Sequence, residues 1–203
     1  LEAAWTRDFP SRLVTLRVGD SIPSGGTWGR SVRFGGLQYG TNFSTQPALV
    51  TTPLLQASGE AVVPSTVDVF VNGRPVSSQA VPPGPFTVEG LPAISGAGQL
   101  QMVVTDAAGR QQVISQPYYS STALLRTGLN EYSFEAGAVR QDYGQRSNAY
   151  GDVAAAATFR RGVSDRFTAE AHAEGRSGNG PRAVGLGGAW QTGGLGVVTA
   201  AVA

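Results

Sequence analysis

The sequence predicts an all-β protein in which two groups of long strands flank a small β-sandwich. Three observations lead to this prediction. Apolar and polar residues alternate with a period of two towards both ends of the chain. The stretch between them holds most of the 12 prolines and contains short strand patterns separated by turns. No apolar run reaches the roughly 18 residues that a transmembrane helix needs. We therefore divide the chain into residues 1–47, 48–120 and 121–203.

The first segment contains two candidate strands. Residues 12–18 alternate strictly and place Arg17 on the polar face. A loop is expected at residues 23–26, which are rich in proline, serine and glycine. The second candidate strand, residues 29–39, contains Gly35-Gly36, and this pair indicates a β-bulge or a bend.

The last segment shows the same alternation in four strands of roughly 9–11 residues, a length typical of membrane-spanning β-strands. These strands are expected at residues 129–140, 151–161, 166–176 and 182–191, followed by an apolar strand at 195–203. Turns are expected around Gly144 and at residues 177–180. One face carries the charged residues Glu131, Glu135, Arg160, Arg166, Glu170, Glu174 and Arg176. The other face carries small apolar residues and the aromatic residues Tyr132, Phe159, Phe167 and Trp190.

Two kinds of sheet have this pattern. In a membrane-spanning β-barrel the apolar face meets lipid and the polar face lines a wet lumen, and the sheet must close because lipid offers backbone amides no partner. A soluble antiparallel sheet with one solvated face alternates in the same way. The periodicity alone favours neither.

Two hairpins and a proline-rich corner organise the middle segment. Asn72-Gly73 separates two apolar alternations, and both residues tolerate the positive φ of a tight hairpin. A second hairpin turns around residues 106–109. The corner is Val81-Pro82-Pro83-Gly84-Pro85-Phe86. By itself it also fits a polyproline II ligand, but strand patterns on both sides favour an internal corner of a β-sandwich.

Composition excludes several classes of function. The 15 basic residues are all arginine and are scattered, and the net charge is +1, so the sequence shows no electrostatic footprint for nucleic acid. There is no cysteine and one histidine, His172, which excludes disulfides, thiolate metal sites and multi-histidine metal sites. We expect no cofactor.

The sequence gives no sign of an enzyme. His172 falls on the polar face of a strand, where we expect it to be solvated. No Gly-x-Ser-x-Gly elbow occurs. Residues 178–183 loosely fit a dinucleotide-binding fingerprint, but the residues that follow alternate as a strand instead of opening a helix. We therefore expect no catalytic residue.

A series of motifs resembles a known family. The motifs are Val67-Asp68-Val69-Phe70-Val71-Asn72-Gly73, the corner from Val81 to Phe86, Gly98-Gln99-Leu100-Gln101-Met102-Val103-Val104 with Asp106 and Gly109, Pro117-Tyr118-Tyr119-Ser120, Leu124-Leu125-Arg126, and Gly128 with Tyr132-Ser133 and Gly137. In this order they resemble the central part of the outer-membrane ushers of the chaperone–usher pilus pathway. The resemblance covers nearly the whole chain and is most specific from Val67 to Gly137.

The resemblance implies a fold, a location and partners. A plug domain, here residues 48–120, would be inserted in a partial transmembrane β-barrel formed by residues 1–47 and 121–203, in the outer membrane of a Gram-negative bacterium. The full protein would receive pilus subunits from a periplasmic chaperone and translocate the fibre, in contact with outer-membrane lipid and with no nucleic acid. The candidate barrel strands are too few to close such a barrel, and the chain lacks an initiator methionine and a signal peptide. We therefore expect a piece of a longer protein.

The charged face leads to a gating hypothesis. We expect lumen-facing charges to hold the plug through polar contacts worth about 0–1 kcal/mol each, weak enough for a gate to release. These residues are Arg17, Glu131, Glu135, Arg160, Arg166, Glu170, Glu174 and Arg176. For any one of them, the alternative is a solvated position with no contact to the plug. For the whole chain, the alternative is a soluble secreted adhesion or carbohydrate-binding β-sandwich protein, which leaves the flanking strands unexplained.

Overall fold

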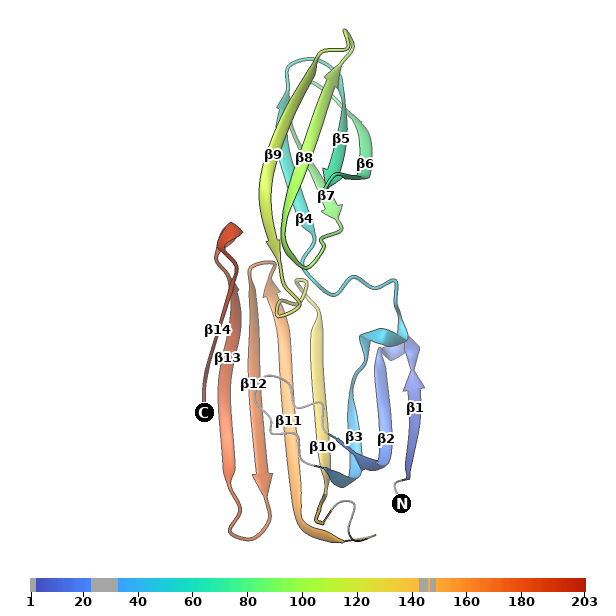
Figure 1. The fold of residues 1–203 in the computed structure, drawn as a ribbon, viewed down its shortest axis with the longest axis vertical. Helices are drawn as coiled ribbons and strands as arrows, with labels where there is room; N and C mark the ends of the chain where they lie inside the picture. The colour runs from blue at the N-terminus through green and yellow to red at the C-terminus, as the bar shows by residue number, and fades with distance from the viewer. Residues whose placement is uncertain (1–2, 23–32, 143–145, 147–148) are drawn as a thin grey trace.

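The computed structural model describes residues 3–22, 33–142, 146 and 149–203. Figure 1 shows an elongated molecule, with a broad sheet at one end and a small sandwich at the other. Regular structure in the described residues consists of β-strands and three short 3-10 turns. Within this part of the chain, no helix is long and apolar enough to cross a membrane. The predicted all-β class is confirmed.

Eight antiparallel strands form the broad sheet, in the order β1-β2-β3-β10-β11-β12-β13-β14. The strands are β1 (Ala4–Phe9), β2 (Val14–Ser21), β3 (Phe34–Thr41), β10 (Asn130–Arg140), β11 (Tyr150–Ser164), β12 (Phe167–Arg176), β13 (Arg182–Gln191) and β14 (Val197–Val202). The sheet is open in the described residues, with β1 and β14 at its edges.

The sandwich is inserted between two strands that are neighbours in this sheet. β3 and β10 pair directly, from Gly40 opposite Ser133 to Phe34 opposite Val139. Both connections to the sandwich therefore leave from the same end of the sheet. The sandwich stands beyond that end, in line with the strands (Figure 1).

A four-stranded sheet, in the order β6-β5-β8-β9, and a two-stranded sheet, β4-β7, make up the sandwich. Its strands are β4 (Leu55–Ala61), β5 (Ser65–Val71), β6 (Arg74–Val81), β7 (Gly84–Leu91), β8 (Gly96–Asp106) and β9 (Gln111–Ser120). Alternation along β5 buries Val67, Val69 and Val71 in the core, together with Leu100 and Met102 of β8. Burying one such valine fully contributes about 1.5–3 kcal/mol relative to leaving it exposed.

The predicted hairpin turns of the sandwich are confirmed. Asn72 and Gly73 join β5 to β6 with φ values of 50° and 76°, and left-handed backbone costs least at these residue types. β8 ends at Asp106, and the turn into β9 passes through Gly109, whose φ is 80°.

The proline-rich motif forms the corner between β6 and β7. Pro82 and Pro83 are exposed between the end of β6 and the start of β7. Phe86 turns into the core, where it is 8% exposed. A Cβ atom at Gly59 of β4 would lie 2.6 Å from the Phe86 ring, so glycine makes room for this ring.

Several strand boundaries differ from the sequence prediction. β1 is a strand that the alternation does not reveal. β2 starts at Val14 because residues 10–12 form a 3-10 turn that ends in Leu13, whose φ is 57°. β3 covers Phe34–Thr41, and the expected residues 29–32 lie outside the described residues. So do the predicted loop at residues 23–26 and the predicted turn residue Gly144.

Of the two alternatives predicted at Gly35-Gly36, a β-bulge or a bend, the bulge is wrong. Both residues keep continuous register with β2 and with β10. A Cβ atom at Gly36 would overlap the carbonyl oxygen of Ala136, and one at Gly35 would lie 2.5 Å from the Tyr150 ring. Close approach of a neighbouring strand and a ring, with no shift of register, is therefore what requires glycine here.

Candidate functional site

The broad sheet has one polar and one apolar face, and the charged residues predicted from the sequence share the polar one. Side chains of one face lie opposite each other in register. One row across five strands is Arg17, Gln38, Glu135, Ala156 and Glu174. A second row is Glu131, Arg160 and Glu170. We call the face that carries these rows the polar face and the opposite one the apolar face.

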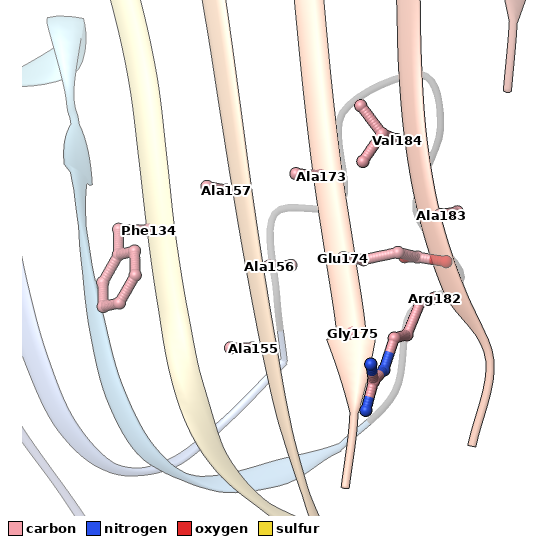
Figure 2. Close-up of a pocket in the computed structure, with 10 residues that line it drawn as sticks. All are labelled: Phe134, Ala155, Ala156, Ala157, Ala173, Glu174, Gly175, Arg182, Ala183 and Val184. Atoms are coloured by element: carbon pink, nitrogen blue, oxygen red, sulfur yellow. The ribbon is translucent and has the colours of Figure 1, made fainter. Parts of the chain in front are cut away.

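Small side chains occupy the middle of the apolar face. Figure 2 shows Ala155 and Ala157 on one side of β11 and Ala156 on the other. On the apolar face, Ala155 and Ala157 leave a shallow hollow of about 460 Å³ between Phe134 and Val184. Large apolar side chains around it are exposed, namely Phe134, Val153, Phe159, Val184, Leu186, Trp190 and Val198. A soluble monomer rarely exposes so continuous an apolar surface, whereas lipid requires one.

A buried hydrogen-bond network lies on the polar face where β2, β3 and β10 meet. Gln38 Nε2 donates to Glu135 Oε1 at 3.1 Å. Gln38 Oε1 accepts from Ser21 Oγ at 2.9 Å and from Arg17 Nη1 at 3.5 Å. Glu135 is 6% exposed and Gln38 is 8% exposed. The network thus brings Arg17 and Glu135 together through Gln38, an uncharged residue that the sequence analysis missed.

Arg160 forms the centre of a second cluster, close to the start of β10. Its Nη1 lies 2.5 Å from Glu131 Oε2, and its Nε lies 3.5 Å from Glu170 Oε2. Its Nη2 donates to the main-chain oxygen of Ala123 at 2.8 Å. Since Ala123 follows β9, this cluster joins three strands of the sheet to the segment that returns from the sandwich.

The expectation that His172 is solvated is wrong, since the side chain is 7% exposed. Its Nδ1 lies 2.8 Å from Oγ1 of Thr158, its register partner in β11. Its Nε2 lies 3.3 Å from Glu174 Oε2. Thr158 of the adjacent strand and Glu174 of the same strand contact the ring, and the pattern of a single strand cannot reveal the partner on its neighbour.

Arg176, a further charged residue of the polar face, is also paired within the sheet. Arg176 Nε lies 3.0 Å from Asp152 Oδ2. Among the described residues, no group of three or more acidic, histidine or cysteine side chains is arranged to hold a metal ion.

A polar cavity of about 340 Å³ lies at the junction of the sheet and the sandwich. Arg166, Asp165 and Gln191 line it from the sheet, and Gln116 and Tyr119 of β9 line it from the sandwich. Gln191 Nε2 donates to the main-chain oxygen of Tyr119 at 2.8 Å. Of the residues in the gating hypothesis, Arg166 is therefore the one that borders the sandwich.

The eight residues of the gating hypothesis thus divide by position. Arg17, Glu131, Glu135, Arg160, Glu170, Glu174 and Arg176 lie on the polar face, and their contacts described above are to neighbours in the sheet or to Ala123. Arg166 lies at the junction. The sandwich stands beyond the end of the sheet (Figure 1), so contacts between these charges and a plug inside the lumen stay a prediction.

Known proteins similar to this chain are ushers. The model of the family described as outer membrane usher protein matches residues 2–203. The outer membrane usher protein FimC of Bordetella pertussis is 32% identical over 133 residues, which cover 66% of this chain and 15% of the relative. The outer membrane usher protein FimD of Escherichia coli K12 is 30% identical over 140 residues, which cover 69% of this chain and 16% of the relative. The chain thus spans only a small part of the length of these relatives.

A solved structure shares the fold. This is the P pilus tip assembly intermediate PapC-PapD-PapK-PapG of Escherichia coli, with a TM-score of 0.61 and 24% identity, covering 97% of this chain and 23% of the matched chain. The family match includes both flanking groups of strands as well as the middle segment. The alternative of a soluble adhesion protein leaves the flanking strands unexplained. The chain therefore belongs to the outer membrane usher family and is part of an outer membrane protein of a Gram-negative bacterium.

Proposed function

We propose that this chain is the part of an usher pore that carries the plug. Residues 1–47 and 121–203 form a section of the pore wall, and residues 48–120 form the plug that gates the channel. The observation that carries this proposal is the insertion of a separately packed sandwich between β3 and β10, which pair with each other. A sheet that stays continuous across the insertion lets the sandwich move without opening the wall.

In this proposal the full protein receives pilus subunits from a periplasmic chaperone and passes the growing fibre through the pore. Subunits join by β-strand addition, in which an extension of one completes the sheet of the next. The polar face would then line the passage. Paired charges such as Arg176 with Asp152 keep that lining wet and bind a passing protein less tightly than unpaired charges would.

We also propose that the segment is not an enzyme. Its buried polar groups bond to neighbouring strands, as Thr158 does to His172. Subunit exchange between β-sheets makes and breaks no covalent bond, so the proposed function needs no catalytic group or cofactor.

Single-channel conductance of the full-length usher in a planar bilayer tests the proposal. The full-length protein is compared with a variant in which a short glycine-serine linker replaces residues 48–120. We expect a quiet unmodified channel and a large, steady conductance after the deletion. An equally quiet channel in both forms, from protein that remains folded in the membrane, would show that the sandwich is not the gate.

A further inference from the structure

The two connections between the sheet and the sandwich are held in different ways. The first connection, residues 42–54, leaves β3, and the second connection, residues 121–129, returns to β10. The second is bonded to the sheet along its length, whereas the first is bonded mainly at its start. This asymmetry bears on where the sandwich can hinge.

A buried hydrogen bond fixes the middle of the second connection. The main-chain nitrogen of Leu125 donates to Thr168 Oγ1 of β12 at 2.8 Å. Thr168 and Leu124 are each 1% exposed, and Leu125 is 4% exposed. A buried amide that loses its acceptor is costly, so the Thr168 hydroxyl holds the connection in one position.

Two residues of the neighbouring strand β11, Arg160 and Gly162, hold the same connection. Arg160 Nη2 donates to Ala123 O at 2.8 Å. The main-chain oxygen of Gly162 accepts from Gly128 N at 2.9 Å, and its nitrogen donates to Leu129 O at 3.0 Å. A Cβ atom at Gly162 would overlap the oxygen of Arg126, so the connection lies directly against this strand. Thr127 Oγ1 completes the attachment with a bond of 2.6 Å to Asp165 Oδ1.

Within the described residues, the first connection is bonded to the sheet only near β3. Asn42 is tied to β2, since its main-chain nitrogen donates to Leu13 O at 2.7 Å and its side chain to Thr15 Oγ1 at 2.8 Å. Gln46 Nε2 donates to Pro10 O at 2.8 Å. Beyond that point, within the described residues, residues 47–54 have one hydrogen bond to another segment, from Arg126 N to Thr51 O at 2.7 Å. This bond leads to the second connection and not to the sheet.

We propose that Thr168 and Arg160 are positioning residues of the gate, which clamp the second connection to the wall so that the sandwich hinges at residues 47–54. The proposal rests on the gating function proposed above. In it, the second connection behaves as part of the wall while the sandwich moves, and loss of the clamp frees both connections and unseats the plug.

Amide hydrogen exchange of the full-length usher in detergent tests the clamp without relying on channel activity. Thr168→Val removes the hydroxyl and keeps the side-chain shape, and Thr168→Ser restores a hydroxyl. We expect exchange at Leu125 to be about tenfold faster in Thr168→Val and near the unmodified rate in Thr168→Ser. Thr158→Val is the matched control, because Thr158 bonds to His172 and not to the connection. Equal exchange in Thr168→Val and the unmodified protein, or equal acceleration in Thr168→Ser, would overturn the clamp.

Channel recordings of the same variants test the effect on the gate. We expect spontaneous openings to be about tenfold more frequent in Thr168→Val than in Thr168→Ser or Thr158→Val. Faster exchange with an unchanged opening frequency would overturn the positioning role. If deleting residues 48–120 also leaves the channel quiet, it is the proposed function that fails, and the exchange result still decides the clamp.

Insertions locate the hinge and keep the proposal testable if Thr168→Val does not assemble. A Gly-Gly insertion after Ala48 lengthens the first connection, and the same insertion after Thr122 displaces the second. We expect the resting conductance to stay within about twofold for the first insertion, because the single bond at Thr51 leaves that stretch free to adjust, and to rise for the second. Equal effects of the two insertions would refute a hinge at residues 47–54.

Discussion

Gln38 and Glu135, which are 97 residues apart in the chain, share a buried hydrogen bond of 3.1 Å. The bond joins β3 to β10, the strands on either side of the inserted sandwich. Residues that pair across the insertion keep the wall continuous whatever the position of the sandwich. For this reason we expect the deletion of residues 48–120 to leave the wall folded.

Replacing Glu131 and Glu135 together by glutamine should raise the resting conductance of the full-length channel. Glu131 holds Arg160, which binds Ala123, and Glu135 accepts from Gln38. Loss of these charged acceptors weakens both contacts of the polar face. We expect the open fraction to rise about tenfold, which corresponds to a combined loss of about 1.4 kcal/mol and matches contacts worth about 0–1 kcal/mol each. Glu60→Gln is the control, because Glu60 is exposed on β4 of the sandwich. Unchanged leak in the double variant would refute a gating role for these charges.

We expect Ala157→Arg to destabilise the sheet in a membrane and Ala156→Arg to be tolerated. Ala157 belongs to the apolar face, and a charge near the bilayer centre costs about 2–4 kcal/mol. Ala156 lies on the polar face in register with Glu135 and Glu174, which are favourable neighbours for a cation. Urea unfolding of the two variants in vesicles measures the difference. Equal stability of Ala156→Arg and Ala157→Arg would contradict our assignment of the two faces.

We expect Gly175→Ala to be tolerated and Gly36→Ala not to be, although each substitution adds one methyl group within a strand. At Gly36 the new Cβ atom meets backbone of β10, which cannot yield as a side-chain end can, and we expect a cost of about 1–3 kcal/mol or failure to assemble. At Gly175 the nearest atom is Cγ of Arg182 at 3.9 Å. The measurement is the fraction of each variant that migrates as folded protein when unheated samples are run on electrophoresis in the cold. Similar yields from the two variants would mean that β3 and β10 lie farther apart than described.

Asp106 should make the stability of the sandwich depend on acid pH. The side chain of Arg110 donates to Asp106 Oδ2 at 2.7 Å, and this bond holds the pKa of Asp106 below its ordinary value of 3.8. The stabilisation is therefore complete above about pH 3.8 and is lost as the pH falls through the lower pKa of the folded state. We expect Asp106→Asn to lower the unfolding temperature of the sandwich at pH 7, and the difference from the unmodified protein to shrink towards pH 2. Calorimetry across this range is the measurement, with Ser115→Ala as a control. A difference that is constant with pH would exclude this role of the carboxylate.

The sequence alone determined those features that depend only on residues close together in the chain. The period-two alternation of β10–β13 assigned charged residues such as Glu135 to one face and apolar residues such as Phe134 and Ala157 to the other, because successive side chains of a strand point to opposite sides. Asn72-Gly73 determined a hairpin, because few other residue pairs accept two positive φ values in succession. The motifs of the middle segment carried the resemblance to ushers, which the family match confirms.

Tertiary structure decided which of these elements meet. No pattern within β3 or β10 shows that they pair, since the pairing spans the whole sandwich and depends on closing a long loop. Burial of His172, the bond between Thr168 and Leu125, and the glycines of β3 are likewise set by neighbouring strands and rings. Alternation specifies the face on which a side chain lies, but its partner depends on the register of another strand, which is fixed only when the packed sheet forms.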